Sequence, residues 1–400
     1  MKAGWERKRL GELLQKTGTT DPTREPEKPF SYIDVSSVSN ETFSITETSE
    51  LLGKDAPSRA RRIVRSGDVI FATIRPTLKR VAIVPDELDN AVCSTGYFVL
   101  RGGSKIDNGY LFYWLFSDEF QAEMESRQKG ASYPAVNDGD IRDQYVPVPP
   151  LNEQRRIVAV LDKAFAGIAT ATANAQKNLT NARALFESYL ESIFSNKDES
   201  WEVGSLKKIG GNVSTGPFGS LLHKSDYVEN GIPLVNPAHI VGEFIEADYR
   251  KSISTKTLSR LSAYILAEND IVIGRRGEIG RCAVVTEAES GWLCGTGCFF
   301  IRPKKSVKAH FLAHLLRSKP YREKLEAMAT GATMLNLSNT ALGELEIALP
   351  SITSQNDHVI KLNEISLLVG DLEGKVRSKL TALTELKQSL LNKAFAGELT

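Results

Sequence analysis

The sequence is poor in cysteine and has no long apolar run. Four cysteines in 400 residues are too few for a disulfide framework, so a reducing cytoplasm is the expected location. No stretch approaches the roughly 20 apolar residues needed to span a bilayer. The charged start, with two lysines, two arginines and one glutamate in its first nine residues, has no apolar segment behind it. We therefore expect neither a signal peptide nor a membrane protein.

The chain also lacks an excess of charge of either sign. Its formal net charge is +1, with 41% hydrophobic and 25% charged residues, which is ordinary for globular proteins. One segment departs from this balance: between Arg59 and Arg80 there are seven basic residues and a single acid, Asp68. Such a cluster is typical either of a solvated face or of a surface that binds nucleic acid.

Catalytic motifs are scarce. The sequence has no P-loop and no glycine-rich cofactor loop, and Asn236-Pro237-Ala238-His239 lacks the second proline and the aromatic residue of an adenine methyltransferase loop. The spacing of Cys294, Cys298, His310 and His314 is close to that of a zinc finger. The matching positions of an internal repeat are Cys93, Tyr97, Gly109 and Tyr113, so the fold does not require zinc. We expect no metal, no cofactor and no enzymatic activity.

An internal duplication is the most informative feature of the chain. Arg75 to Val84 lies 201 residues before Arg276 to Val285, and the same offset separates Cys93 to Arg101 from Cys294 to Arg302. Further pairs at this offset are Pro149 and Pro350, Gln154 and Gln355, and Leu185 and Leu386. A repeat this long is far beyond any solenoid period and indicates a tandem duplication of a whole unit.

Each copy begins with about 150 residues of mixed character. Residues 67–74 and 269–274 read as a turn followed by a strand, and residues 81–84 and 97–101 as further strands. Helices are predicted to start near Tyr110 and His310. The fold class is therefore α+β, with a mixed domain at residues 1–150 and a second one at 197–350.

Each mixed domain is followed by a long helix, at residues 151–196 and 351–400. Prolines end both domains, and Asn152 and Thr353 or Ser354 are candidate N-caps. Apolar or small residues recur every three or four positions, which is a heptad seam. The seam consists of Leu161, Phe165, Ile168, Thr172, Ala175, Leu179, Ala182, Phe186, Tyr189 and Ile193 in the first helix, and Leu362, Ile365, Val369, Leu372, Val376, Leu383, Leu386 and Leu390 in the second.

A helix with a single apolar seam needs a partner to be stable. The nearest partner is the helix of the other copy, and the intervening domain lets the chain return, so an antiparallel coiled coil of about 65 Å is expected. Two similar domains on such a coiled coil are related by a pseudo-two-fold axis, as are successive major-groove faces of DNA. The alternative is that each helix binds an unknown partner separately.

The candidate DNA contacts lie in three polar segments of each copy. The first precedes the domain's strands, the second is the basic turn between two strands, and the third follows the domain's helices. Arginine and lysine there suit phosphates, and small polar side chains with glycine suit close approach to bases. The alternatives are ion pairs that support a turn, and plain loops. The candidates are Thr19, Thr20, Arg75, Lys79, Arg80, Ser132 and Tyr133 in the first copy, and Phe218, Ser220, Arg275, Arg276, Arg281, Thr333, Met334 and Asn336 in the second.

These features together resemble the specificity subunits of type I restriction–modification systems, over nearly the whole chain. The most specific marks are Pro-Pro-Leu-Asn-Glu-Gln-Arg-Arg-Ile-Val at residues 149–158 and Leu-Leu-Asn-Lys-Ala-Phe-Ala-Gly-Glu-Leu at 390–399. The start of the second helix, residues 350–358, keeps Pro350 and Gln355 but departs from the Glu-Gln-Arg pattern. That departure puts in doubt whether its contacts match those of the first helix.

The resemblance implies that each mixed domain is a target recognition domain for double-stranded DNA. It also implies that the helices space these domains and bind two methyltransferase (M) subunits, and that restriction (R) subunits join the complex. Because the candidate loops differ between the copies, we expect an asymmetric bipartite target. The competing hypothesis is a duplicated coiled-coil adaptor without DNA readout.

Overall fold

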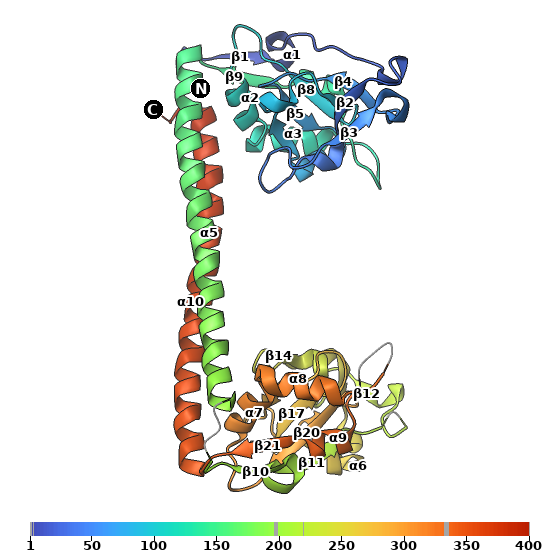
Figure 1. The fold of residues 1–400 in the computed structure, drawn as a ribbon, viewed down its shortest axis with the longest axis vertical. Coiled ribbons are helices and arrows are strands. Elements are labelled where there is room, and N and C mark those ends of the chain that lie inside the picture. The colour runs from blue at the N-terminus through green and yellow to red at the C-terminus, as the bar shows by residue number, and fades with distance from the viewer. Residues whose placement is uncertain (1, 3, 196–198, 219, 332–335, 400) are drawn as a thin grey trace. The chain divides into compact units, whose positions relative to one another are not determined.

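The structure is a computed structural model of the chain, and it describes residues 2, 4–195, 199–218, 220–331 and 336–399. The chain divides into two compact units. Unit 1 comprises residues 1–175 and 377–400, and unit 2 comprises residues 176–376. Each unit therefore contains one α+β domain with parts of both long helices, as Figure 1 shows by colour. The α+β class predicted from the sequence is confirmed.

Unit 1 is built from short strands and helices before the first long helix. The strands are β1 Glu6–Arg9, β2 Pro29–Ile33, β3 Ser49–Leu52, β4 Ala60–Ile63, β5 Val69–Ala72, β6 Val81–Ile83, β7 Val92–Ser94, β8 Tyr97–Leu100 and β9 Tyr145–Val148. The helices are α1 Leu10–Leu13, α2 Asn108–Trp114, α3 Asp118–Arg127 and α4 Asp138–Arg142, and the long helix α5 Leu151–Ser195 begins in unit 1 and continues into unit 2. The strands form sheets of order β6-β5-β8, β3-β2-β7-β4 and β1-β9.

Unit 2 repeats this plan with more short strands. They are β10 Glu202–Ser205, β11 Gly211–Thr215, β12 Tyr227–Val228, β13 Leu234–Val235, β14 Ile240–Val241, β15 Phe244–Ile245, β16 Ser252–Ile253, β17 Ile271–Gly274, β18 Cys282–Val284, β19 Leu293–Cys294, β20 Cys298–Pro303 and β21 Glu346–Leu349. The helices are α6 Thr255–Arg260, α7 Ala309–Arg317, α8 Lys319–Met328 and α9 Asn339–Glu344, and the long helix α10 Ile352–Ala396 begins in unit 2 and ends in unit 1. The main sheet has the order β11-β20-β17-β18.

The central strand of each domain is apolar throughout because both of its faces are buried. In β5, Val69 and Phe71 belong to the hydrophobic cluster that includes α2 and α3, while Ile70 and Ala72 belong to a second cluster. Strand β17 alternates in the same way between two clusters. A strand covered on both faces reads as a continuous hydrophobic run, as both segments do in the sequence.

The long helices pack against each other within each unit. In unit 1, Leu161 of α5 is fully buried in one cluster with Leu391 and Ala394 of α10. In unit 2, Leu362 of α10 is fully buried with Leu190 and Phe194 of α5. The beginning of each helix thus lies beside the end of the other, which is an antiparallel pairing. The sequence prediction of paired long helices is confirmed.

Two details of the helix predictions are wrong. Both helices begin before the expected N-caps, at Leu151 and Ile352. In the second helix the capping hydrogen bond comes from the residue before it, because the Ser351 hydroxyl accepts from the Ser354 amide at 3.3 Å. Leu386, placed in the seam, is 47% exposed. Its neighbour Lys387 is half-buried instead, because its ammonium lies over aromatic rings.

By length and composition alone, α5 is apolar enough to cross a membrane, and it is the one such helix among the described residues. A single helix of this kind is weak evidence of a membrane span. In both units α5 packs along α10 instead.

Candidate DNA interface

In unit 1 the structure brings the basic turn and the polar loop together. Arg75 and Lys79 flank a short 3-10 turn and both have positive φ, at 50° and 54°. The Arg75 amide donates to the Pro134 carbonyl at 2.7 Å, and its guanidinium lies 5.0 Å from the centre of the Tyr133 ring. Arg75 Nη2 also donates to the Ser132 carbonyl at 3.3 Å. Arg75, Ser132 and Tyr133 thus form one exposed cluster, in which the Tyr133 side chain is 72% exposed.

The first polar segment joins the same edge of unit 1 through Arg62. Thr19 forms a β-bridge with Arg62, and the Thr20 amide donates to the Arg61 carbonyl at 2.9 Å. The Arg62 guanidinium forms two hydrogen bonds, of 2.9 and 3.0 Å, with the carboxylate of Asp138. Asp138 is the first residue of α4 and directly follows the polar loop. Three segments distant in sequence are therefore linked at one edge.

Unit 2 has the same arrangement with different chemistry. Asn336 Oδ1 accepts from Arg275 Nε at 3.2 Å and from Arg276 Nε at 3.4 Å. Burial, with a smaller contribution from Arg276, lowers the pKa of Arg275, and its guanidinium lies over the Phe299 ring. Two adjacent cations therefore converge on one amide, where unit 1 presents an arginine and a tyrosine.

The first polar segment of unit 2 is again connected to the third. Asn339 Nδ2 donates to Thr215 Oγ1 at 3.1 Å, and Asn339 stands 201 residues after Asp138. Phe218 is 61% exposed and Ser220 is exposed beyond this contact. The candidates Thr333 and Met334 lie outside the described residues.

The other basic candidates have internal partners. Arg80 Nη1 donates to the Val35 carbonyl at 2.7 Å, and Arg281 Nη1 donates to the Ile240 carbonyl at 3.4 Å. Both guanidiniums are half-buried and hold an equivalent loop of their domain. This geometry favours the alternative of a supporting role for Arg80 and Arg281. Lys79 is half-buried. Burial, with a further contribution from the Lys79 charge, lowers the pKa of Lys387.

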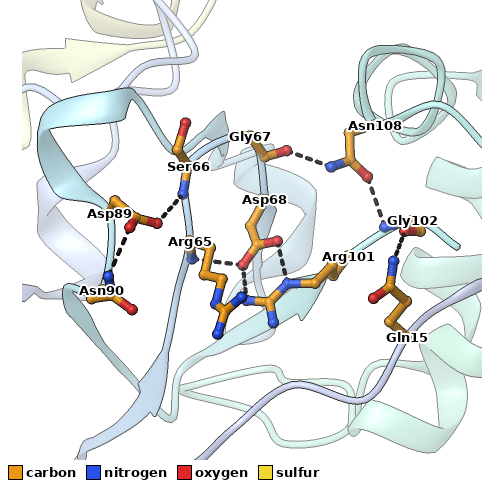
Figure 2. A network of polar contacts seen from close by, with 10 residues as sticks. All are labelled: Gln15, Arg65, Ser66, Gly67, Asp68, Asp89, Asn90, Arg101, Gly102 and Asn108. Atoms are coloured by element: carbon orange, nitrogen blue, oxygen red, sulfur yellow. Dashed lines mark hydrogen bonds and ion pairs between the residues drawn. The ribbon is translucent and has the colours of Figure 1, made fainter.

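An ion pair with a buried aspartate supports each site and was missed in the sequence, although its residues recur in the repeat. Figure 2 shows Asp68, which accepts from Arg101 Nε and Nη2 at 2.8 and 2.6 Å and from the Arg65 amide at 2.8 Å. In unit 2, Asp270 accepts from Arg302 at 2.9 and 2.7 Å. Both aspartates are 1% exposed. Each pair ties the strand that leads to the basic turn to its neighbouring strand.

A repeated glutamine joins each domain to its helix. Gln154 Nε2 donates to the carbonyls of Lys105 and Pro149, and its Oε1 accepts from the Asp107 amide. Gln355 makes the same three bonds, at 2.9–3.1 Å, with Ser306, Pro350 and Lys308. The helix starts are therefore equivalent at this position. Although the sequence around Gln355 departs from that around Gln154, the two glutamines make the same contacts.

The structure also explains the incomplete zinc-finger pattern. Cys294 and Cys298 belong to the cluster on one face of the unit 2 sheet, whereas α7, which carries His310 and His314, packs on the other face. Among the described residues, no group of three or more His, Cys, Asp and Glu side chains is placed to hold a metal ion. The Asn236 segment is a capped 3-10 turn, and Asn236 Oδ1 accepts from the Gly297 amide.

Comparison with known proteins places the chain in a family. Residues 2–181 and 198–382 match the model of the family described as Type I restriction modification DNA specificity domain. The chain belongs to this family, as the resemblance of its sequence predicted. Its role is DNA sequence specificity, and specificity subunits are the non-catalytic members of type I systems.

Individual relatives agree. The type I restriction enzyme MjaVIII specificity subunit of Methanocaldococcus jannaschii is 24% identical over 74% of this chain and 71% of its own length. The HsdS subunit of Thermoanaerobacter tengcongensis is 29% identical, with a TM-score of 0.67 over 99% of this chain and 97% of its own. A chain from structural work on complex assembly and conformational transition of the type I R-M system is 29% identical, with a TM-score of 0.87 over 99% of both chains.

Proposed function

We propose that this chain reads an asymmetric two-part DNA sequence and directs separate adenine methyltransferase and restriction subunits to it in the cytoplasm. The observation that carries the proposal is that the two units repeat one arrangement of loops but present different side chains on it. The same three loop segments are linked in both units, but one presents Arg75 and Tyr133 and the other presents Arg275, Arg276 and Asn336. Unlike donor sets recognise unlike base edges, so the two half-sites differ.

Within each cluster we assign contacts by chemistry. Arg75 is exposed beside an exposed aromatic ring, and it is held by the backbone of the polar loop. A positioned arginine suits guanine or a phosphate. In unit 2, Arg276 is exposed while Arg275 is partly covered, so Arg276 is the stronger candidate for a DNA contact. Thr19, Thr20, Ser132, Phe218 and Ser220 complete the proposed surfaces. Lys79, Arg80 and Arg281 act as supports.

The helix pair is the proposed binding surface for two methyltransferase subunits. Large apolar side chains remain exposed on it, among them Leu185 at 70% and Leu368 at 69%. Apolar groups at a helix surface are favoured where a partner covers them. The competing hypothesis, an adaptor without DNA readout, is not favoured by the family.

The decisive experiment is methylome sequencing of a host that expresses the chain with the methyltransferase subunits of its own system. We expect adenine methylation in one motif whose two unlike parts are separated by a gap of fixed length. Methylation should disappear when the chain is omitted. A continuous or palindromic motif, or an unchanged pattern without the chain, would overturn the proposal.

Recruitment is tested separately with the purified subunits. Leu185→Glu and Leu368→Glu should weaken methyltransferase binding without unfolding the chain, because both side chains are largely exposed. Arg24→Glu, at an exposed side chain outside the two long helices, is the control. Equal binding by all three variants contradicts the assignment of this surface.

A further inference from the structure

Each unit carries a small hairpin with a phenylalanine near its tip. In unit 1, Val38 forms a β-bridge with Ile45, and Phe43 lies between them in sequence. In unit 2, Ile240 of β14 pairs with Ile245 of β15, and Phe244 is the first residue of β15. The two hairpins are equivalent because each follows a capped 3-10 turn of the same kind, at Asp34 and at Asn236.

In unit 1 this phenylalanine is clamped. The Phe43 ring packs edge-on against Phe116, with ring centres 4.6 Å apart, and the Lys387 ammonium of α10 lies 4.7 Å from the centre of the Phe43 ring. The same ammonium lies 4.9 Å from the Phe165 ring of α5. Lysine over aromatic rings is attractive, more so where water is excluded. The hairpin is therefore fixed to α10, through a lysine that also contacts α5.

The backbone of Phe43 shows that this clamp is strong. Its φ is 54°, a left-handed conformation that is unfavourable for a bulky aromatic residue and persists only where its surroundings impose it. In the unit 2 hairpin the left-handed position is taken by Gly242, with φ of 60°. That hairpin carries no comparable strain.

In unit 2 the corresponding clamp is empty. The positions 201 residues from Lys387, Phe165 and Phe116 are Phe186, Ser366 and Arg317. All three line a groove of about 890 Å³, together with Phe244 and Leu367. Phe244 is 75% exposed and Leu367 is also 75% exposed. Phe244 and Leu367 are thus exposed at this groove, whereas Phe43 occupies the equivalent place in unit 1.

One contact holds this hairpin near the groove without closing it. Glu243, next to Phe244, forms an ion pair of 2.7 Å with Arg317 of α7. The pair anchors the turn of the hairpin to its own domain. With this ion pair formed, the Phe244 ring lies beside the groove and remains exposed to solvent.

We propose that the β14–β15 hairpin is a lid that closes in solution over this groove, seating Phe244 against Phe186 and Leu367 as Phe43 is seated in unit 1. The structure shows the lid open. Closure removes exposed apolar surface from water and needs no break of the Glu243–Arg317 pair, which serves as a pivot. The hairpin of unit 1 is held against α10, whereas the hairpin of unit 2 opens and closes.

The test compares thermal unfolding of full-length variants by scanning calorimetry. If the lid closes, Phe244→Ala lowers the melting temperature by about 2–4 °C, in the same direction as Phe43→Ala. Leu368→Ala, at a residue that is 69% exposed and lies outside the groove, leaves the melting temperature unchanged. If the lid stays open, Phe244→Ala melts as the parent protein does, since a side chain this exposed contributes little, and the proposal fails.

A double-mutant cycle identifies where Phe244 is seated. Closure predicts that Phe244→Ala costs less in the presence of Leu367→Ala than alone, because the two side chains share one contact. Leu367 is an exposed residue, so this cycle does not depend on a variant that disrupts the core. Strictly additive effects overturn the assignment of the groove. The outcome is independent of DNA binding.

Discussion

Asp68 supports the unit 1 site from inside the domain. Its carboxylate is buried and accepts two hydrogen bonds from Arg101, which follows β8 and is only 17% exposed, and a third from the Arg65 amide. A buried pair contributes little net stability compared with an apolar pair, but the loss of one partner leaves an uncompensated charge. The pair therefore acts mainly by fixing β5 and the turn that presents Arg75.

Asp68→Asn should lower the free energy of unfolding by about 3–5 kcal/mol, as measured by chemical denaturation. The substitution keeps the shape of the side chain but removes the charge that Arg101 requires. Arg127→Ala is the control, because its ion pair with Glu123 is exposed on both sides and should contribute less than about 1 kcal/mol. Similar losses for both variants would contradict the structural importance of the buried pair.

His314 makes the stability of unit 2 depend on pH. Burial, with a contribution from the Arg317 charge, lowers its pKa to about 3 in the folded protein. His310 adds to this effect, an Asn363 hydrogen bond opposes it, and Glu243 lies 3.7 Å from Nδ1. The folded state therefore favours the neutral ring.

Because the folded pKa lies below the unfolded value of 6.5, the stability from His314 is complete above pH 6.5 and is lost as the pH falls toward 3. The loss should reach about 2 kcal/mol between pH 6.5 and pH 5. Denaturation of His314→Gln across this range should show a flatter dependence. His223→Gln, at an exposed histidine, should keep the parent slope, and equal slopes in all three proteins would refute the assignment.

At the scale of elements, the helix pair combines a buried seam with exposed apolar positions. Leu161 and Leu362 are fully buried at the two helix starts, where a helix meets both its partner and a domain. Along the same helices Leu185, Leu367 and Leu368 are mostly exposed. The predicted heptad seam separates these two groups, because it includes Leu161 and Leu362 and omits the three exposed leucines.

Leu362→Ala should destabilise the chain by about 2–5 kcal/mol, since it removes a side chain from a closed cluster and leaves a cavity. Leu368→Ala removes the same atoms from an exposed position and should change stability by less than about 0.5 kcal/mol. Urea denaturation of the two variants measures the difference. Equal losses would mean that Leu368 is covered in solution.

For the whole molecule, the duplication divides recognition into two parts that change independently. If Arg75 and Tyr133 read one half of the proposed target, Arg75→Ala with Tyr133→Ala should relax or abolish preference in that half alone, with a loss of about 1–3 kcal/mol for each base contact removed. Methylome sequencing shows this as degeneracy confined to one part of the motif. The exposed Arg127→Ala variant should leave the motif intact. Degeneracy in both parts would contradict the division.

The sequence by itself determined the duplication, the α+β class and the two long helices, because these follow from repeat spacing, hydrophobic periodicity and the prolines before each helix. It also placed Arg75 and the Ser132 loop among the candidates. It did not separate Arg75, exposed at the edge, from Arg80, which binds the Val35 carbonyl. Both are basic residues of one turn, and only the packing around them decides their partners.

Tertiary structure alone decided the contacts between distant segments. The Arg62–Asp138 bridge, the bonds of Gln154 to Lys105 and of Gln355 to Lys308, and the Phe43 clamp each join residues more than 40 positions apart. Their energies depend on burial and distance, neither of which a local pattern encodes. Burial and distance also decide that Lys387 is half-buried while Leu386 is exposed. The rings of Phe43 and Phe165, which come from two separate parts of the chain, surround the position of Lys387 and favour a cation at it.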